Sequence, residues 1–244
     1  LNTAATLGGS LKDIGVDNVQ INLADGGATG YQDDLNSLFD GDGKLNAELL
    51  DDLSAIRQTD GSGVDQGMHV NTIDLGGPGP GHVGAVNINE SQAGALIDAG
   101  LHFAAGDQIT LQASTSAGTH LHNSLKELTK LGVDTVMVSG VDTVSVDLGG
   151  LGVGDLGAGA GGVHLPQFEA ADHKDLTVTL DVANLGELNT AATLGGSLKD
   201  IGVDNVQINL ADAGATGYQE IGRAHVWNSS HLGISYAVFC LKKK

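Results

Sequence analysis

The sequence predicts an α/β fold in which repeated helix–strand units form a two-layer parallel α/β solenoid or an open sheet, with one sheet face exposed to solvent. Three observations support this. A long segment of the chain recurs almost unchanged, helical apolar stripes alternate with strands, and the strands themselves alternate apolar with polar residues. Strands covered on both faces would be almost continuously apolar, so this alternation indicates a single buried face.

The repeat is the most informative feature of the chain. Residues Leu1–Gln32 recur as Leu188–Gln219 at an offset of 187, and they differ only where Gly26 becomes Ala213. Such periods are typical of repeat proteins, in which each unit buries its apolar face against its neighbours. We therefore interpret the chain as a slice of a tandem-repeat polymer and expect it to show no native terminus.

Three segments carry apolar residues at i, i+4 and i+7, which places those residues on one helix face. Gly15, Gly132 and Gly202 stand where a left-handed C-terminal cap is expected. Asn89 and Gln92 have the spacing of a capping box, which predicts another helix start. The three apolar stripes are Leu7, Leu11 and Ile14; Leu49, Leu53 and Ile56; and Leu121, Leu125 and Leu128.

A Val-Asp-x-Val motif leads from the glycine caps into alternating strands. It occurs at Val16–Val19, Val133–Val136 and Val203–Val206, and a related motif occupies Val141–Val144. Alternation of helix and strand favours parallel strands joined by helical crossovers. The residues expected to face one continuous core are Ile21, Leu111, Val146 and Val178, and those expected on the exposed face are Gln20, Asn22, Gln108, Thr110 and Gln112.

The same patterns predict the organisation of the chain. Residues 1–148 form a block of helix–strand repeats, and residues 149–163 form a Gly-rich connector. Residues 164–219 continue the repeat block, with 188–219 as the start of the next 187-residue period.

The segment after Gln219 has a different character. Residues 220–231 resemble the conceptual translation of a sequencing adapter, and Ile234–Leu241 continue that resemblance into three terminal lysines. The resemblance implies that residues 220–244 are a non-native, artefactual tail, and the alternative is a genuine basic tail. We exclude them from fold reasoning.

Without the tail, the chain is strongly acidic. Residues 1–219 contain 29 acidic and 7 basic residues, a formal net charge of −22, and they contain no Cys because the one Cys is Cys240. Such a charge repels nucleic acid and anionic membranes and favours cation binding. No apolar run reaches the length of about 20 residues that a membrane helix needs, so we expect neither membrane insertion nor a nucleic-acid partner.

Calcium is the one cofactor that the sequence indicates. Asp40-Gly41-Asp42-Gly43 resembles a degraded calcium loop, in which Leu38 and Leu49 replace two principal oxygen ligands. A plain acidic turn before a helix starting near Asn46 is the alternative. The candidate calcium ligands are Asp33, Asp34, Asp40, Asp42 and Asp155.

Asp155 belongs to Gly149–Leu156, which resembles the glycine-rich nonapeptide of calcium-binding secreted toxins and adhesins with one residue inserted. A flexible connector is the alternative for this segment. His120 and His122 are the only closely spaced histidines before the tail, and their i, i+2 spacing disfavours a shared metal. No nucleophile elbow or phosphate-binding loop occurs, so we expect no enzymatic activity.

Near-identical copies, acidity and the absence of Cys from residues 1–219 resemble the long repeat regions of giant bacterial adhesins, including calcium-binding RTX adhesins. The units Ser124–Leu128 and Ser10–Ile14 add to this likeness. The resemblance implies a structural or adhesive segment of a secreted or cell-surface bacterial protein, stiffened by calcium and flanked by neighbouring repeats. Two alternatives stay open: a repeat-built binding surface for a glycan or protein, and a polysaccharide-active enzyme on a solenoid.

Overall fold

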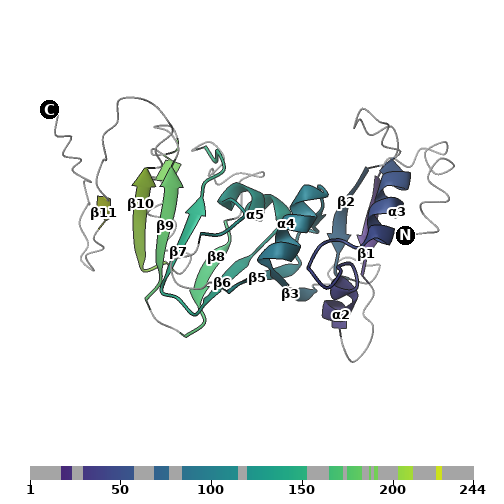
Figure 1. Ribbon diagram of the computed structural model, residues 1–244, viewed down its shortest axis with the longest axis horizontal. Coiled ribbons are helices and arrows are strands. Elements are labelled where there is room, and N and C mark those ends of the chain that lie inside the picture. Colours follow the sequence, from purple (N-terminus) through teal and green to yellow (C-terminus); the bar gives the residue numbers. More distant parts are fainter. Residues whose placement is uncertain are drawn as a thin grey trace. The chain divides into compact units, whose positions relative to one another are not determined.

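The computed structural model describes residues 18–23, 30–57, 69–76, 84–114, 120–152, 165–172, 175–182, 187, 190–191, 203–210 and 224–226. These residues form helices and mostly parallel strands arranged in open sheets, so the chain is α/β as predicted (Figure 1). The chain divides into two compact units, residues 1–112 with 130–134 and residues 113–129 with 135–244.

The first unit contains two groups of parallel strands. β1 (Asn18–Asn22) pairs with β2 (His69–Asp74), which pairs with the short β4 (His102–Phe103). β3 (Ala85–Asn89) pairs with β5 (Gln108–Ser114), whose last two residues are assigned to the second unit. All of these pairs are parallel, as the alternation of helices and strands predicts.

Three helices of the first unit connect these strands. α2 (Gly30–Asn36) and α3 (Ala47–Arg57) lie between β1 and β2 in the sequence, and α4 (Glu90–Asp98) follows β3 directly. Leu49, Leu53 and Ile56 of α3 are buried, as their spacing predicts. The guanidinium of Arg57 at the end of α3 donates to the carbonyl oxygen of Val70, which fastens this helix to β2.

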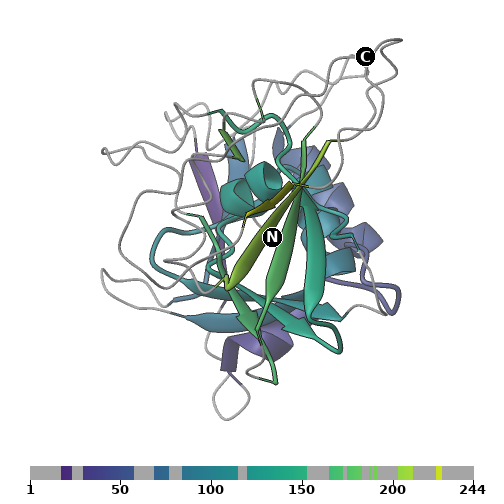
Figure 2. The ribbon, with the colours of Figure 1, turned by 90° about the vertical axis from the view of Figure 1, so that its left-hand side faces the viewer.

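The second unit repeats the pattern. β6 (Thr135–Ser139) pairs in parallel with β8 (Gln167–Ala170). β7 (Thr143–Asp147), β9 (Thr177–Val182) and β10 (Asn205–Leu210) form a parallel sheet in the order β10-β9-β7, visible edge to edge in Figure 2. α5 (Leu125–Leu131) contributes residues to both units.

The alternation of burial along the strands confirms that the residues predicted to face the core are buried. Leu111, Val146 and Val178 are at most 1% exposed and Ile21 is 5% exposed. Gln20, Asn22, Gln108 and Gln112 are exposed, whereas the smaller Thr110 is half-buried. One strand face therefore packs into the core and the other carries polar side chains, as expected when a single face is covered.

The helix ends follow the sequence in two places. Asn89 and Gln92 form the predicted capping box at α4, with each side chain accepting from the other residue's backbone N–H. Gly132 has a φ of 88°, the left-handed conformation expected after α5.

The third apolar stripe is only partly helical. Leu121, Leu125 and Leu128 are all buried, but α5 begins at Leu125. Leu121 precedes the helix, and its N–H donates to the carbonyl oxygen of Ser145 in β7. The spacing predicted burial correctly and helix extent incorrectly, because Ser124 caps the helix from inside the stripe.

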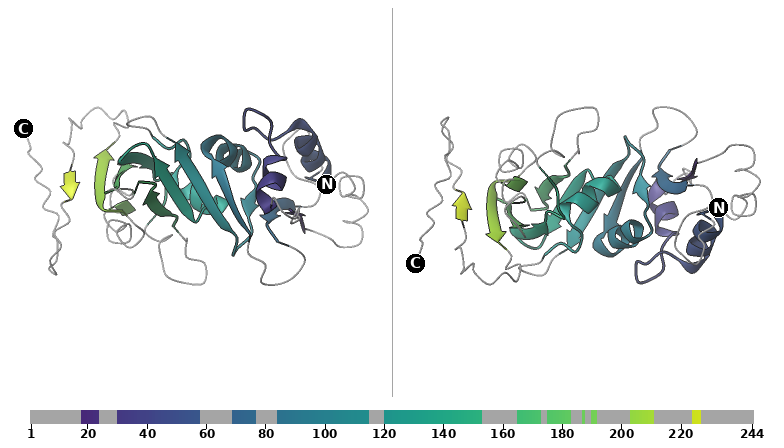
Figure 3. Two further views of the ribbon diagram at one scale, coloured as in Figure 1. Left: turned by 90° about the horizontal axis from the view of Figure 1, so that it is seen from below. Right: turned by 90° about the horizontal axis from the view of Figure 1, so that it is seen from above.

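Several predictions fall outside the described residues. They concern the stripe Leu7–Ile14, the caps at Gly15 and Gly202, and all but the first four residues of the connector 149–163. Of the tail, three residues are described: β11 (Ala224–Val226) pairs antiparallel with β10 (Figure 3). Within the described part of the chain, no helix is long and apolar enough to cross a membrane.

Candidate functional site

The polar face of the first unit carries hydrogen bonds that run from strand to strand. The Gln20 amide nitrogen donates to Oδ2 of Asp74 at 2.8 Å and to Oδ1 of Asn22 at 2.7 Å. The Gln112 amide of β5 donates to Oδ1 of Asn87 of β3 at 3.0 Å. These amides therefore link adjacent parallel strands on the solvent side of the sheet.

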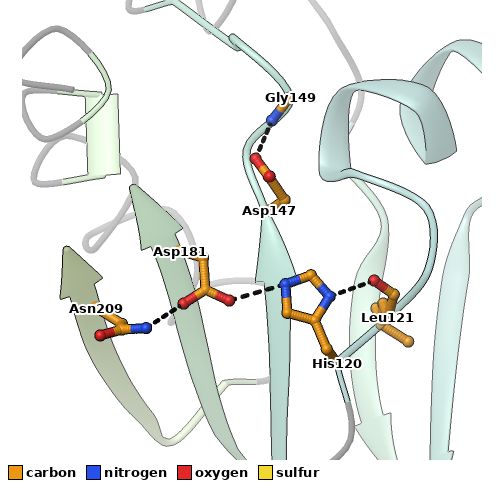
Figure 4. A network of polar contacts seen from close by, with 6 residues as sticks. All are labelled: His120, Leu121, Asp147, Gly149, Asp181 and Asn209. Atoms are coloured by element: carbon orange, nitrogen blue, oxygen red, sulfur yellow. Dashed lines mark hydrogen bonds and ion pairs between the residues drawn. The ribbon is translucent and has the colours of Figure 1, made fainter. Parts of the chain in front are cut away.

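The second unit has a comparable network centred on Asp181 of β9 (Figure 4). Its Oδ2 lies 2.9 Å from Nε2 of His120, and its Oδ1 accepts from the Asn209 amide at 2.7 Å. Nδ1 of His120 lies 2.6 Å from the carbonyl oxygen of Leu121. Both ring nitrogens of His120 therefore lie within hydrogen-bond distance of oxygen atoms. The Asp181 carboxylate thus connects β9 to β10 and to the loop before α5.

The sequence did not predict this network, because His120 and Asp181 are 61 positions apart in the chain. The spacing of His120 and His122 argued only against a shared metal, and the His120 side chain is half exposed. Only the parallel pairing of β7 with β9 brings Asp181 near the strand that His120 approaches. No local signal would have identified the partner.

A second recurrent feature is an aspartate whose carboxylate accepts a backbone N–H at the start of a neighbouring strand. Oδ2 of Asp134 accepts the Ile109 N–H at 2.8 Å, and the Asp134 N–H donates back to the Ile109 carbonyl at 2.9 Å. Asp204 and Leu176 make the same reciprocal pair, at 2.9 and 3.1 Å. We call this reciprocal pair the aspartate brace.

Both braces use the Asp of the Val-Asp-x-Val motif. Asp134 precedes β6 and Asp204 precedes β10, and each is bonded to a residue at the start of another parallel strand. A carboxylate that accepts a backbone N–H at a strand entry satisfies a donor that the ladder leaves without a partner. The sequence showed the motif, but its function became apparent only with the neighbouring strand in place.

Asp107 makes a more buried variant of this contact. It is 6% exposed, and its two carboxylate oxygens accept the N–H groups of Leu75 and Gly84 at 3.0 and 3.2 Å. Gly84 stands immediately before β3, and Leu75 immediately after β2. One carboxylate therefore ties the end of one strand to the beginning of another.

The Gln32 side chain occupies backbone groups at one edge of β3. Nε2 of Gln32 donates to the Asn87 carbonyl at 2.8 Å, and its Oε1 accepts the Asn87 N–H at 2.7 Å. The amide of this α2 residue thus makes the two bonds that a neighbouring strand would make with Asn87. Occupation of backbone groups in this way limits pairing with foreign strands.

The acidic loop predicted as a calcium site is a tight turn. Oδ1 of Asp40 accepts the N–H groups of Asp42 and Lys44 at 2.9 and 3.0 Å, and Phe39 and Leu45 form an antiparallel bridge that closes the turn. The helix that follows is capped by Asn46, whose Oδ1 accepts the Leu49 N–H. The plain alternative, an acidic turn before a helix near Asn46, accounts for these contacts.

These contacts do not bring the candidate calcium ligands together at one place. Asp33 and Asp34 belong to α2, Asp40 and Asp42 belong to the turn, and Asp155 lies outside the described residues. Among the residues that the structure describes, no three His, Cys, Asp or Glu side chains are placed to hold one metal ion.

The start of the predicted connector is an ordered turn next to the cap of α5. Ser124 and Glu127 form this cap, and the Glu127 carboxylate accepts from both the N–H and the hydroxyl of Ser124. A Cβ on Gly149 would lie 2.3 Å from the Ser124 hydroxyl oxygen, and its φ is 64°. Gly149 therefore permits a close approach that no other residue permits.

Comparison with protein-family models, curated proteins and solved structures finds no match for this chain.

Proposed function

We propose that this chain is a structural repeat segment of a large extracellular bacterial protein and acts as a spacer or adhesive stalk. The observation that carries the proposal is the aspartate brace, which recurs in both units at the same sequence motif. A local contact that recurs at the same sequence motif, and in each case joins two parallel strands, is expected of a chain built by adding similar units to one another. Repeat proteins extend in this way because each unit contacts mainly its neighbours.

The placement outside the cell follows from the resemblance and the charge. Residues 1–219 have a net charge of −22 and no Cys, which fits an exported polymer that is kept soluble by its acidity and needs no disulfides. Surface display of the full-length protein on intact cells, detected with an antibody against residues 33–187, tests this part of the proposal. Labelling that appears only after cell lysis would contradict it.

The spacer function predicts how length depends on the number of periods. Chains with one, two and three 187-residue periods should show a maximum dimension in small-angle X-ray scattering that grows in equal steps. Equal steps are expected because each added period contacts only its neighbours and lengthens the stack without folding back. A radius of gyration that follows the scaling of a single compact globule, about 2.2·N^0.38 Å for N residues, would contradict the proposal.

Calcium is proposed as a stiffening ligand. A chain of two joined periods in chelator and low salt should be expanded, and millimolar calcium should compact it and raise its melting temperature. A ligand that binds only the folded state adds RT ln(1 + [L]/Kd) to stability, and divalent ions also reduce the repulsion between the many carboxylates. Thermal unfolding followed by circular dichroism measures the shift.

The controls are magnesium at equal concentration and sodium chloride at matched ionic strength. If salt alone reproduces the shift, calcium only screens charge and the segment is an acidic spacer without specific sites. Asp40→Asn and Asp42→Asn are suitable variants, because an Asn side chain at position 40 retains an oxygen that can accept from the backbone of the turn. A calcium response undiminished in these variants would place the sites elsewhere.

A further inference from the structure

The duplicated segment forms a strand in both of its copies. β10 (Asn205–Leu210) has the same sequence as residues Asn18–Leu23, which contain β1. Both strands pair with a parallel neighbour, β1 with β2 and β10 with β9. The two copies therefore show the same strand in two different surroundings.

The two copies use opposite edges. In the first copy, the Leu23 N–H donates to the Asp74 carbonyl, so Leu23 and Ile21 direct their backbone groups toward β2. In the second, the Thr177 N–H donates to the Asp142 carbonyl, so Thr177 faces β7 and Val178 faces β10. Val206 pairs with Val178, so its neighbours Asn205 and Gln207, and alternate residues after them, face β9. Asn205 corresponds to Asn18 of the first copy. Asn18 and Leu23 are an odd number of residues apart, so their backbone groups point to opposite edges of the strand. Because successive residues point to opposite sides of a strand, the edge used in one copy is the edge left over in the other.

The polar side chains agree with this assignment. In the first copy, Gln20 reaches Asp74 across one edge and also donates to Oδ1 of Asn22. In the second copy, Asn209, the counterpart of Asn22, donates through Nδ2 to Asp181 across the other edge. The two sets of bonds use different atoms of the same amide, so a single strand can make both.

The burial of the apolar side chains points the same way. Ile21 and Ile208 occupy equivalent positions and are 5% and 7% exposed, whereas their partners Ile73 and Leu180 are fully buried. Val19 and Val206 are only half-buried. Each copy has one parallel neighbour, β2 for the first copy and β9 for the second, and its core-facing residues are covered less completely than those of interior strands.

We propose that, in the repeat polymer, each copy of this strand lies between the Thr177–Val182 strand of the preceding period on one edge and the His69–Asp74 strand of its own period on the other. The interaction surface is the outer edge of β10, formed by the backbone groups of Val206 and Ile208, and its occupant is the His69–Asp74 strand of the period that begins at Leu188. Consecutive periods then share one continuous parallel sheet, joined by a polar chain that runs from Asp74 through the Gln and Asn amides to Asp181. This inference rests on the proposed repeat function and specifies its junction.

The outer edge of β10 is already able to accept a strand. β11 pairs with Val206, Gln207 and Ile208, and it does so in antiparallel orientation with three residues of the predicted non-native tail. An exposed edge of this kind is a template for strand addition. In our proposal β11 occupies the position that this His69–Asp74 strand takes in the polymer.

Hydrogen exchange tests the junction. Three chains are compared: the full chain, a chain ending at Gln219, and a chain in which Gln219 is followed by a second copy of residues 33–219. In the two-period chain, the amides of Val206 and Ile208 should exchange at least about tenfold more slowly than in the chain ending at Gln219 and approach Val178 and Leu180, because they become part of an interior ladder. Equal exchange in the two chains would overturn the proposal.

A matched pair of substitutions adds a second measurement. In the two-period chain, Gln207→Ala should lower the melting temperature by as much as Gln20→Ala does, since each variant loses a bond to an Asp74 side chain. In the chain ending at Gln219, Gln207→Ala should have a clearly smaller effect than Gln20→Ala. Equal effects of Gln207→Ala in both chains would overturn the junction. If length still grew in equal steps per period, the spacer function would stand without it.

Discussion

Replacing Val146 with Asp should lower the free energy of unfolding by roughly 4 kcal/mol, the largest effect that we expect from a single substitution. Val146 is fully buried in β7, between β9 and the loop that leads to α5. An Asp there places an unpaired carboxylate in the apolar core, which costs far more than the lost contacts of the Val side chain. Urea denaturation followed by circular dichroism measures the difference.

Ser145→Asp is the matched control, because Ser145 is the next residue in the same strand and points to the polar face. Its side chain is half-buried, and a carboxylate there stays in contact with water. We expect a change of less than about 1 kcal/mol. Equal losses at the two positions would mean that both faces of β7 are covered, and the single-faced sheet would then be wrong.

Asp107→Ala should destabilise the first unit by about 3 kcal/mol, because two buried N–H groups lose a charged acceptor at once. These N–H groups belong to Leu75 and Gly84, at the end of β2 and before β3. Asp107→Asn keeps one oxygen acceptor and should lose about half as much. The free energy of unfolding in urea gives both values.

Asp98→Ala serves as the control for a lost acidic side chain. Asp98 is exposed at the end of α4, where a negative charge is unfavourable to the helix dipole, so its removal should be neutral or slightly stabilising. If Asp98→Ala and Asp107→Ala cost the same, the effect would come from net charge and not from the hydrogen bonds. An unchanged stability of Asp107→Ala would show that water replaces the carboxylate.

Local features of the sequence predicted much of the secondary structure. The spacing of Leu49, Leu53 and Ile56 predicted the buried face of α3, and Asn89 with Gln92 predicted the start of α4. Such features are readable because capping and amphipathic spacing depend on residues only three or four positions apart. The predicted start of α5 was wrong, because Ser124 caps the helix and it begins at Leu125 and not at Leu121.

The candidate sites were less accessible to sequence reasoning. The acidic loop stays a predicted calcium site, but its local geometry, in which Oδ1 of Asp40 accepts two backbone N–H groups of its own turn, could not be derived from the residue types alone. The Asp of the Val-Asp-x-Val motif was visible, but its acceptor role depends on a strand entry 25 residues away at Ile109 and 28 residues away at Leu176. Contacts at such separations are not encoded in any local spacing.

The sequence alone determined the period of 187 residues, the α/β composition and the face of each strand that is buried, because identity and alternation are properties of the chain itself. Tertiary structure alone decided which strands are neighbours, which edge of the repeated strand each neighbour occupies, and which carboxylates hold them. Strand pairing joins residues that are far apart in sequence. The burial of apolar side chains does not by itself distinguish one partner strand from another. Only the folded chain selects the partner, through the fit of backbone register, aspartate braces and amide bonds.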